Sequence, residues 1–274
     1  MTVVSAIAIV AAVIALAVTA MLLVRRRAPA GSVFEDGDRA SGVFGVLATG
    51  FSVLLGLIVF LAFTSYDQSR SGAETEAVVL RQQFETAQFL PEPARTQLGG
   101  ELVCYARAVV HQEWPRLAAG TEGEAFNPWT VPMFRTIKTV TPKNGPEQTA
   151  YDNWMDFTSD REQARSDRVH GAVGVIPRAL WVVLFFIAAT IFAFMLFLAD
   201  SGERWYAQAM LMGSVAGVIT ATLLLIAFLN SPIRAHGGLQ PTAMTRALAV
   251  LDQERAAVGD RSPPPCDTTG ARTV

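Results

Sequence analysis

Four long runs without any ionisable side chain most strongly constrain the fold of this chain. They cover Val3–Val24, Val43–Thr64, Ala179–Leu198 and Ala209–Leu229, and each is 20 to 22 residues long. A helix of 20 residues rises about 30 Å, which is the thickness of the hydrocarbon layer of a bilayer. Core helices of soluble proteins are usually shorter and amphipathic. The runs therefore predict an all-α integral membrane protein with four transmembrane helices.

The polar residues between and after these runs suggest how the rest of the chain is divided. We expect five segments: a first transmembrane helix with a basic loop (1–42), the second transmembrane helix (43–64), a helical extramembrane cap (65–176), a transmembrane hairpin (177–230), and a tail with an amphipathic helix and a disordered end (231–274). Charged residues make up 17% of the chain and the net charge is −2. This balance gives no indication of a nucleic-acid partner.

The positions of the arginines predict an orientation in the cell membrane. Arg25–Arg27 follow the first run, whereas no basic residue precedes it. Arginines beside a membrane helix favour the cytoplasmic side, so the amino terminus is expected outside. Alternation then places the 65–173 region and the carboxyl tail in the extracytoplasmic compartment. Arginines ahead of the third run give the opposite bias, but long loops are largely exempt from this rule.

Small and hydroxyl-bearing residues recur on one face of two of the runs. Thr49, Ser52 and Gly56 form a candidate pore or packing face on the second run, and Gly213 and Gly217 lie four apart on the fourth. Such residues let helix backbones approach closely in lipid, either within one bundle or between subunits. Because no run contains an ionisable residue, a proton relay is disfavoured. A pore would be walled by apolar side chains, hydroxyls or backbone.

Turn and capping signals divide the extramembrane region into helices. Residues 71–90 form either a separate helix with a capping box or a continuation of the second run. Pro93 can begin a second helix that ends at Glu113-Trp114-Pro115, because proline disfavours helix at the preceding residue. A short helix is expected at 133–140 and a longer one from Pro146. These helices are too few to predict a large independent core.

Three arginines share one face of the helix that leads into the third run. Arg161, Arg165 and Arg168 are spaced four and three apart. They are candidates for attracting an inorganic anion at a pore mouth. The alternative is a solvated face on which they pair with neighbouring acids. Glu113 could be a buried partner of one of them, since a buried carboxylate needs such pairing.

The cysteines and histidines predict a candidate disulfide and no metal or catalytic site. Cys104 and Cys266 are the only cysteines, and the expected topology places both where disulfides persist. They are therefore a candidate disulfide, with two separate thiols as the alternative. His111, His170 and His236 are too scattered for a metal site. The chain has no phosphate-binding loop and no hydrolase or metalloprotease motif, so we expect no cofactor and no enzyme activity.

Three stretches resemble the bestrophin-like domain family of bacterial and plant membrane proteins. They are Tyr105–Gly120, Arg161–Trp181 and Leu229–Pro241. The family pattern has a helix that ends in Glu-Trp-Pro, matched by Glu113, Trp114 and Pro115. It also has an arginine-bearing helix followed by Ile-Pro-x-x-Leu-Trp, matched here by Ile176, Pro177, Leu180 and Trp181.

This chain departs from the family pattern at one place. After the last run the family often has Asp-x-Pro-Phe-x-Gly, where this chain has Asn230 and Ile233. The similarity extends over roughly residues 40–255 and leaves the first run largely outside.

The resemblance implies a homo-oligomer in the lipid bilayer, because the family name records a distant similarity to bestrophins, which are pentameric anion channels. By analogy the protein is an anion channel. The alternative is a non-conducting envelope scaffold or sensor whose helical cap binds a partner.

Overall fold

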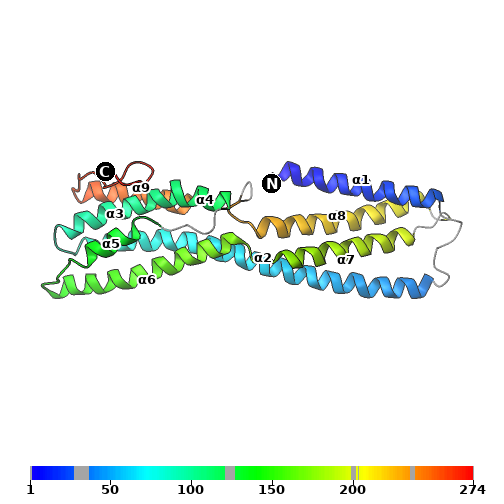
Figure 1. Ribbon diagram of the computed structural model, residues 1–274, viewed down its shortest axis with the longest axis horizontal. Helices are drawn as coiled ribbons and strands as arrows, with labels where there is room; N and C mark the ends of the chain where they lie inside the picture. The colour runs from blue at the N-terminus through cyan, green and yellow to red at the C-terminus, as the bar shows by residue number, and fades with distance from the viewer. Residues whose placement is uncertain are drawn as a thin grey trace. The chain divides into compact units, whose positions relative to one another are not determined.

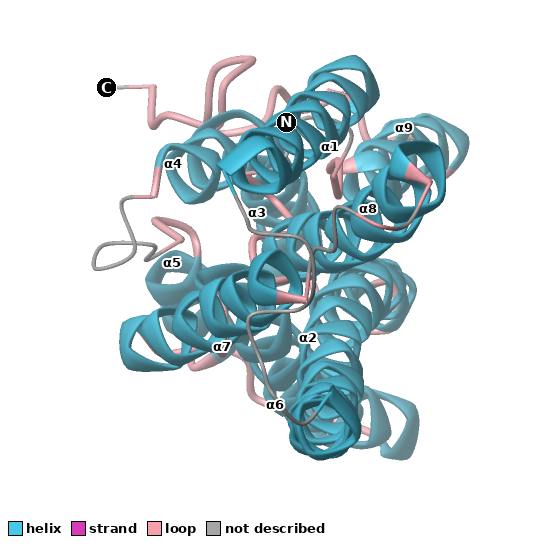
Figure 2. Cartoon of the chain, turned by 90° about the vertical axis from the view of Figure 1, so that its right-hand side faces the viewer, coloured by secondary structure: helices cyan, strands magenta, loops and turns pink. Residues whose placement is uncertain are grey.

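A computed structural model describes the chain at residues 2–27, 37–120, 127–198, 202, 204–234 and 238–273. Within these residues the regular structure is helical, apart from one isolated β-bridge between Cys266 and Arg272 (Figure 2). The all-α prediction is confirmed.

The helices form two compact units. The first comprises Met1–Thr64 and Val175–Asn230, and we call it the membrane unit. The second, which we call the cap, comprises Ser65–Gly174 and Ser231–Val274. One helix, α2 (Gly37–Ala87), contributes residues to both units.

The membrane unit contains the four predicted membrane helices. They are α1 (Val3–Arg27), the first part of α2, α7 (Arg178–Phe197) and α8 (Trp205–Leu229), and Figure 1 shows them running alongside one another. All four are long and apolar enough to cross a bilayer. Pro177 lies just before α7 in an extended conformation, where its lack of an N–H leaves no helical hydrogen bond unmade.

Two small cores hold the membrane unit together. In one, Phe51 and Ile58 of α2 pack with Leu184 of α7 and Ile219 of α8. In the other, Met21 and its neighbours on α1 pack against α8. Many large apolar side chains point outward instead: Leu16 is 73% exposed and Phe186 is 71% exposed. An apolar outer surface of this extent suits lipid rather than water.

The cap is built from the second part of α2 and six further helical segments. They are α3 (Ala94–Ala108), the π-helix η1 (Val109–Glu113), α4 (Trp114–Ala119), α5 (Thr130–Ile137), α6 (Gly145–Val173) and α9 (Thr242–Ala257). Prolines lie at several helix starts. Asn144 caps α6, since its side-chain oxygen accepts a hydrogen bond from the backbone N–H of Glu147 at 2.9 Å.

One open alternative is decided and one helix boundary differs from the sequence-based expectation. Of the two alternatives for residues 71–90, the structure has the continuation, because α2 runs without a break to Ala87. The Glu113-Trp114-Pro115 stretch does not end a helix: the wide turn of η1 leads directly into α4. Pro115 lies in the first turn of α4, where the missing N–H would have no intrahelical partner in any case.

The cap has a larger core than we expected. From Leu98 to Val109, α3 and the start of η1 are buried almost all round, and they pack with side chains from α2, α5, α6 and α9. Leu98, Leu102 and Tyr105 each have 0% exposure. A central helix that buries every face needs few neighbours to make a contiguous core, which a count of helices does not reveal.

The carboxyl tail is ordered rather than disordered as predicted. A disulfide joins Cys266 to Cys104 on α3. Trp129 donates a hydrogen bond from its indole nitrogen to the carbonyl oxygen of Gly270 at 2.7 Å. Gly270 has φ +83°, and a Cβ there would lie 2.4 Å from the backbone nitrogen of Ala108. The composition of the tail by itself suggests disorder. It does not reveal the observed order, because the residues that hold the tail in place lie far away in the sequence.

Candidate functional site

The predicted face of α2 is uncovered in the single chain. Thr49, Ser52 and Gly56 are exposed, and a Cβ built at Gly56 would meet no atom within 4 Å. Ser52 donates its hydroxyl hydrogen bond to the carbonyl oxygen of Ala48 at 2.9 Å. A hydroxyl that donates to its own helix in this way can still accept a hydrogen bond, because its oxygen keeps a free lone pair. Among the described residues of the membrane unit, no contact accounts for the small residues on this face.

The expected small-residue contacts do occur on α8. A Cβ at Gly213 would lie 3.3 Å from Ile14 Cγ2, and a Cβ at Gly217 would lie 3.1 Å from Ile14 Cδ1. These two glycines therefore serve packing within one bundle, against α1. Their role differs from that of the open face of α2.

Asn230 has a local structural role at the end of α8. Its side-chain oxygen accepts hydrogen bonds from the backbone N–H groups of Val175 and Ile176, at 2.9 and 3.0 Å. The side chain therefore ties the segment before α7 to the end of α8. Trp181, one turn into α7, stacks on Phe185 with ring centroids 5.9 Å apart.

Arg168 is the centre of a buried ionic network in the cap. Its guanidinium has no exposed surface and lies 2.5 Å from a carboxylate oxygen of Glu76 and 2.9 Å from one of Glu113. The ring of Trp114 covers it at 5.5 Å, and Tyr105 donates its hydroxyl to Glu76 at 2.7 Å. Two carboxylates around one guanidinium explain why the charges tolerate burial.

Electrostatics fix the protonation states in this network. Burial by itself lowers the pKa of Arg168, but the negative charges of Glu76 and Glu113 outweigh it and raise the pKa above its ordinary value. Burial, together with the charge of Glu76, raises the pKa of Tyr105 well above its ordinary value. Arg168 is therefore a permanent cation and Tyr105 a permanent hydrogen-bond donor at physiological pH.

The other two arginines of the predicted trio differ in exposure. Arg161 is 1% exposed, and its Nη1 donates to Gln83 at 2.7 Å while its guanidinium covers the ring of Tyr105 at 4.8 Å. Arg165 lies 3.4 Å from Glu113 and keeps 16% of its side chain exposed. A buried guanidinium cannot meet an anion from solvent, so in this conformation only Arg165 could act at a pore mouth.

The Glu113-Trp114-Pro115 motif supplies partners for these arginines. Glu113 is buried and faces Arg165 and Arg168, and Trp114 donates its indole N–H to the carbonyl oxygen of Leu239 at 3.2 Å. Pro115 stays on the surface of the cap. The motif therefore places one acid and one aromatic ring against a helix that is remote in sequence.

Sequence reasoning missed the residues of α2 that complete the network. Glu76 and Gln83 are fully buried, and Ser69 donates its hydroxyl to the carbonyl oxygen of Arg168 at 2.9 Å. With Gly72 they recur three, four and seven residues apart, which is the spacing of one helix face. A polar stripe with this period was the available signal, but such a stripe more often faces water.

Among the described residues no three of His, Cys, Asp and Glu are grouped so that they could hold a metal ion. His111 and His170 are described, whereas His236 lies outside the described residues.

A comparison with known protein families finds one that matches most of this chain. The sequence pattern of the Bestrophin-like domain matches residues 11–244. The match begins at residue 11, within α1, so most of the first span lies inside it, contrary to the expectation that this span lies largely outside. No curated protein matches the chain in sequence.

Solved structures resemble the fold at low sequence identity. Two are point variants of a bacterial bestrophin homologue from Klebsiella pneumoniae, each 14% identical, with TM-scores of 0.66 and 0.67. They cover 89% and 88% of this chain, and 98% of their own chains. A third, described as a membrane protein, is 13% identical with a TM-score of 0.64 and covers 95% of this chain and 98% of its own.

Proposed function

Because this chain belongs to the Bestrophin-like domain family, we propose that it forms an oligomeric anion channel in the cell membrane. Bestrophins are anion channels, and this family is known for channels rather than for enzymes. The uncovered face of α2, with Thr49, Ser52 and Gly56, is the observation that carries the proposal. In an assembly of several copies this face would line the pore.

The chemistry of this face suits weak, transient contact with an anion. The hydroxyl hydrogen of Thr49, and that of Ser52 once it turns away from the carbonyl oxygen of Ala48, can replace part of the hydration shell of a halide without binding it tightly. Conduction requires such weak binding, since a tightly held ion does not leave. The absence of acidic side chains in the second apolar run also avoids repelling an anion.

The orientation of the chain is part of the proposal. We place the amino terminus, the 65–173 region and the carboxyl tail outside the cytoplasm. Two features support this placement: Arg25–Arg27 follow the first span, and the cap contains the Cys104–Cys266 disulfide. Disulfides persist in oxidising compartments and are rare in the cytosol.

Single-channel recording with cysteine variants tests the pore. Full-length protein is reconstituted in planar bilayers with a KCl gradient, and we expect a reversal potential close to that of chloride. A negatively charged methanethiosulfonate reagent should reduce the current of Thr49→Cys, because it adds charge and bulk to the pore. Thr19→Cys is the matched control: Thr19 is an exposed threonine on α1, and its hydroxyl donates to the carbonyl oxygen of Ala15 at 2.7 Å.

Three outcomes of the recording and of particle imaging separate the alternatives. Equal block of Thr49→Cys and Thr19→Cys would remove α2 from the pore. An intact oligomer without conductance would favour an envelope scaffold or sensor whose cap binds a partner. A monomer without conductance would contradict the channel altogether.

A further inference from the structure

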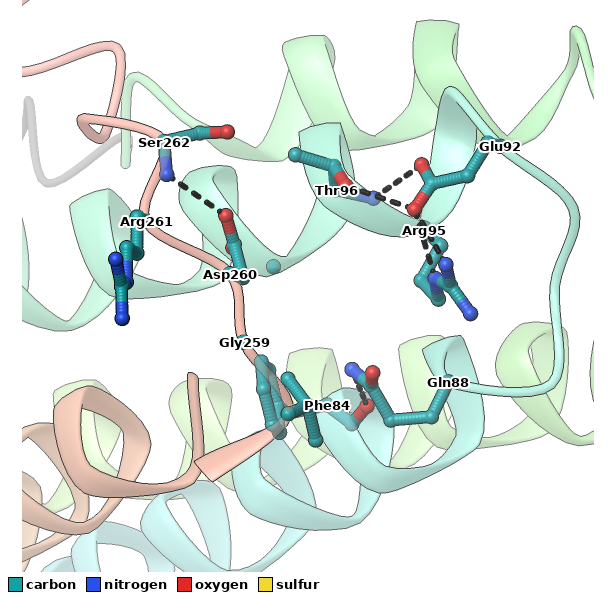
Figure 3. Close-up of a pocket in the computed structure, with 11 residues that line it drawn as sticks. Phe84, Gln88, Glu92, Arg95, Thr96, Gly259, Asp260, Arg261 and Ser262 are labelled. Atoms are coloured by element: carbon teal, nitrogen blue, oxygen red, sulfur yellow. Dashed lines mark hydrogen bonds and ion pairs between the residues drawn. The ribbon is translucent and has the colours of Figure 1, made fainter. Parts of the chain in front are cut away.

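The cap contains a polar pocket that the proposed channel does not use. Its volume is about 440 Å³, within the usual range for small-molecule sites. The end of α2, the start of α3 and the loop after α9 line it, and Phe84 forms an apolar wall (Figure 3).

Both carboxylates of the pocket are already neutralised. Glu92 accepts from Arg95 Nε at 2.8 Å and from the hydroxyl of Thr96 at 3.0 Å. Asp260 accepts from Arg255 at 2.8 Å and from the backbone N–H of Ser262 at 3.0 Å. Despite the opposing effect of burial, these hydrogen bonds lower the pKa of both acids, so both are charged at neutral pH. Neither acid is left to bind a cation.

The donors of the pocket are in excess. Arg95 uses Nε and Nη2 toward Glu92, and its Nη1 has no partner in the described part of the chain. Arg261, on the loop after α9, makes no hydrogen bond or ion pair with any described residue. Three guanidiniums, with that of Arg255, stand against two carboxylates, which leaves one positive charge.

The side opposite the loop supplies an acceptor. Gln88 donates its amide nitrogen to the carbonyl oxygen of Phe84 at 3.2 Å, and Figure 3 shows the end of this side chain at the pocket. Its amide oxygen has no partner among the described residues. The pocket therefore combines unused guanidinium donors, one amide acceptor and an aromatic wall.

We propose that this pocket binds a small organic anion of the carboxylate class. Guanidinium groups bind carboxylates through strong charge-assisted hydrogen bonds. Arg261 and the free nitrogen of Arg95 would hold the carboxylate, with the carbon chain against Phe84 and a hydroxyl or amino group at Gln88. This inference concerns the cap alone and does not depend on ion conduction.

Calorimetric titration of the full-length protein in detergent tests the site. 4-Hydroxybutyrate, which has one carboxylate and one hydroxyl, is the probe, and saturable binding is expected below about 10 mM. Arg261→Gln should weaken binding about tenfold or more, which is the effect of one lost hydrogen bond to a charged group. Glu92→Gln should instead strengthen it, because it releases Nε and Nη2 of Arg95 to the ligand.

The matched control is Arg70→Gln, since Arg70 is an exposed cap arginine that pairs with Glu74 away from the pocket. Its affinity for 4-hydroxybutyrate should equal that of the parent protein. Opposite shifts in Arg261→Gln and Glu92→Gln cannot arise from a general loss of folding. No saturable binding of 4-hydroxybutyrate, unchanged binding in Arg261→Gln, or saturable binding of inorganic phosphate but not of 4-hydroxybutyrate would each overturn the proposal.

Discussion

The helices of the membrane unit and those of the cap are held together by different forces. In the membrane unit the helices contact one another through apolar side chains, and the outer surface is equally apolar. Burial from lipid gives little gain there, so close packing has to hold the helices together. In the cap, apolar burial from water builds the core, and the Arg168 network and a disulfide fix its arrangement. We therefore expect a single substitution to lower the free energy of unfolding more in the cap than in the membrane unit.

Glycine contacts show the same contrast. A Cβ at Gly72 in the cap would lie 2.6 Å from the backbone nitrogen of Arg168, and one at Gly171 would lie 2.6 Å from the carbonyl oxygen of Ser65. Backbone atoms cannot move aside. In the membrane unit, Gly217 faces only the flexible end of Ile14.

Removing Arg168 is expected to have the largest effect. Arg168→Met leaves Glu76 buried without its cation and Glu113 with Arg165 alone, and it should lower the free energy of unfolding by about 3–5 kcal/mol. Hydrogen exchange measured by mass spectrometry should rise in α3 and α6 of the cap and stay unchanged in α1. Arg70→Met, which breaks an exposed ion pair, is the control and should exchange like the parent. An exchange pattern of Arg168→Met identical to that of the parent would remove the network from the account of cap stability.

Loss of the disulfide should come next. Cys104 and Cys266 are 162 residues apart in the sequence, and replacing both with alanine should cost about 2–4 kcal/mol, mainly because the unfolded chain becomes less restricted. Thermal unfolding followed by circular dichroism in detergent measures the change. A reductant should lower the midpoint of the parent protein and leave that of the double variant unchanged. If the reductant leaves the parent unchanged although the bond is shown to be reduced, the staple does not stabilise the cap.

Alanine at the two kinds of glycine contact sharpens the comparison directly. Gly72→Ala should cost about 1–3 kcal/mol, because its new methyl group meets backbone. Gly217→Ala should cost less, because the end of Ile14 can rotate away. The two thermal midpoints, measured in the same detergent, give the order. Equal losses would mean that lipid-facing helices are as closely fitted as the cap.

The smallest effect concerns Glu101, a buried acid for which burial outweighs the opposing positive charge of Arg272. Burial raises the pKa of Glu101 to about 7, although Thr136 donates a hydrogen bond to it at 2.9 Å. The unfolded chain releases this proton near the ordinary pKa of about 4.3, so the cap loses stability as pH rises from there to about 7.

Glu101→Gln mimics the protonated acid and tests this pH dependence. It should match the parent near pH 4 and exceed it at pH 8 by about 1 kcal/mol, a shift of roughly one pKa unit after allowance for solvent. Thermal midpoints across this pH range measure the difference. An identical pH dependence in both proteins would show that Glu101 titrates normally.

The apolar runs, Pro177 and the helix-capping residues were sufficient to predict four membrane helices and most helix starts, because these depend on neighbours within a few residues. Thr49, Ser52 and Gly56 could be chosen as a candidate face because they share one side of a helix, and their role at a pore stays a prediction. The partners of Arg161 and Arg168 were less accessible. Glu113 could be suspected, whereas Glu76 and Gln83 lie in a polar stretch that local patterns assign to solvent.

What the sequence determined by itself is therefore the environment of each segment: lipid for four runs and water for the rest. Hydrophobicity is a property of each side chain, so this information is local. Only the tertiary structure decided which charges are buried together, that the tail is ordered by Cys104, and where a polar pocket opens beside Arg95. Those outcomes depend on distances between residues that are remote in sequence, and no local pattern encodes such distances.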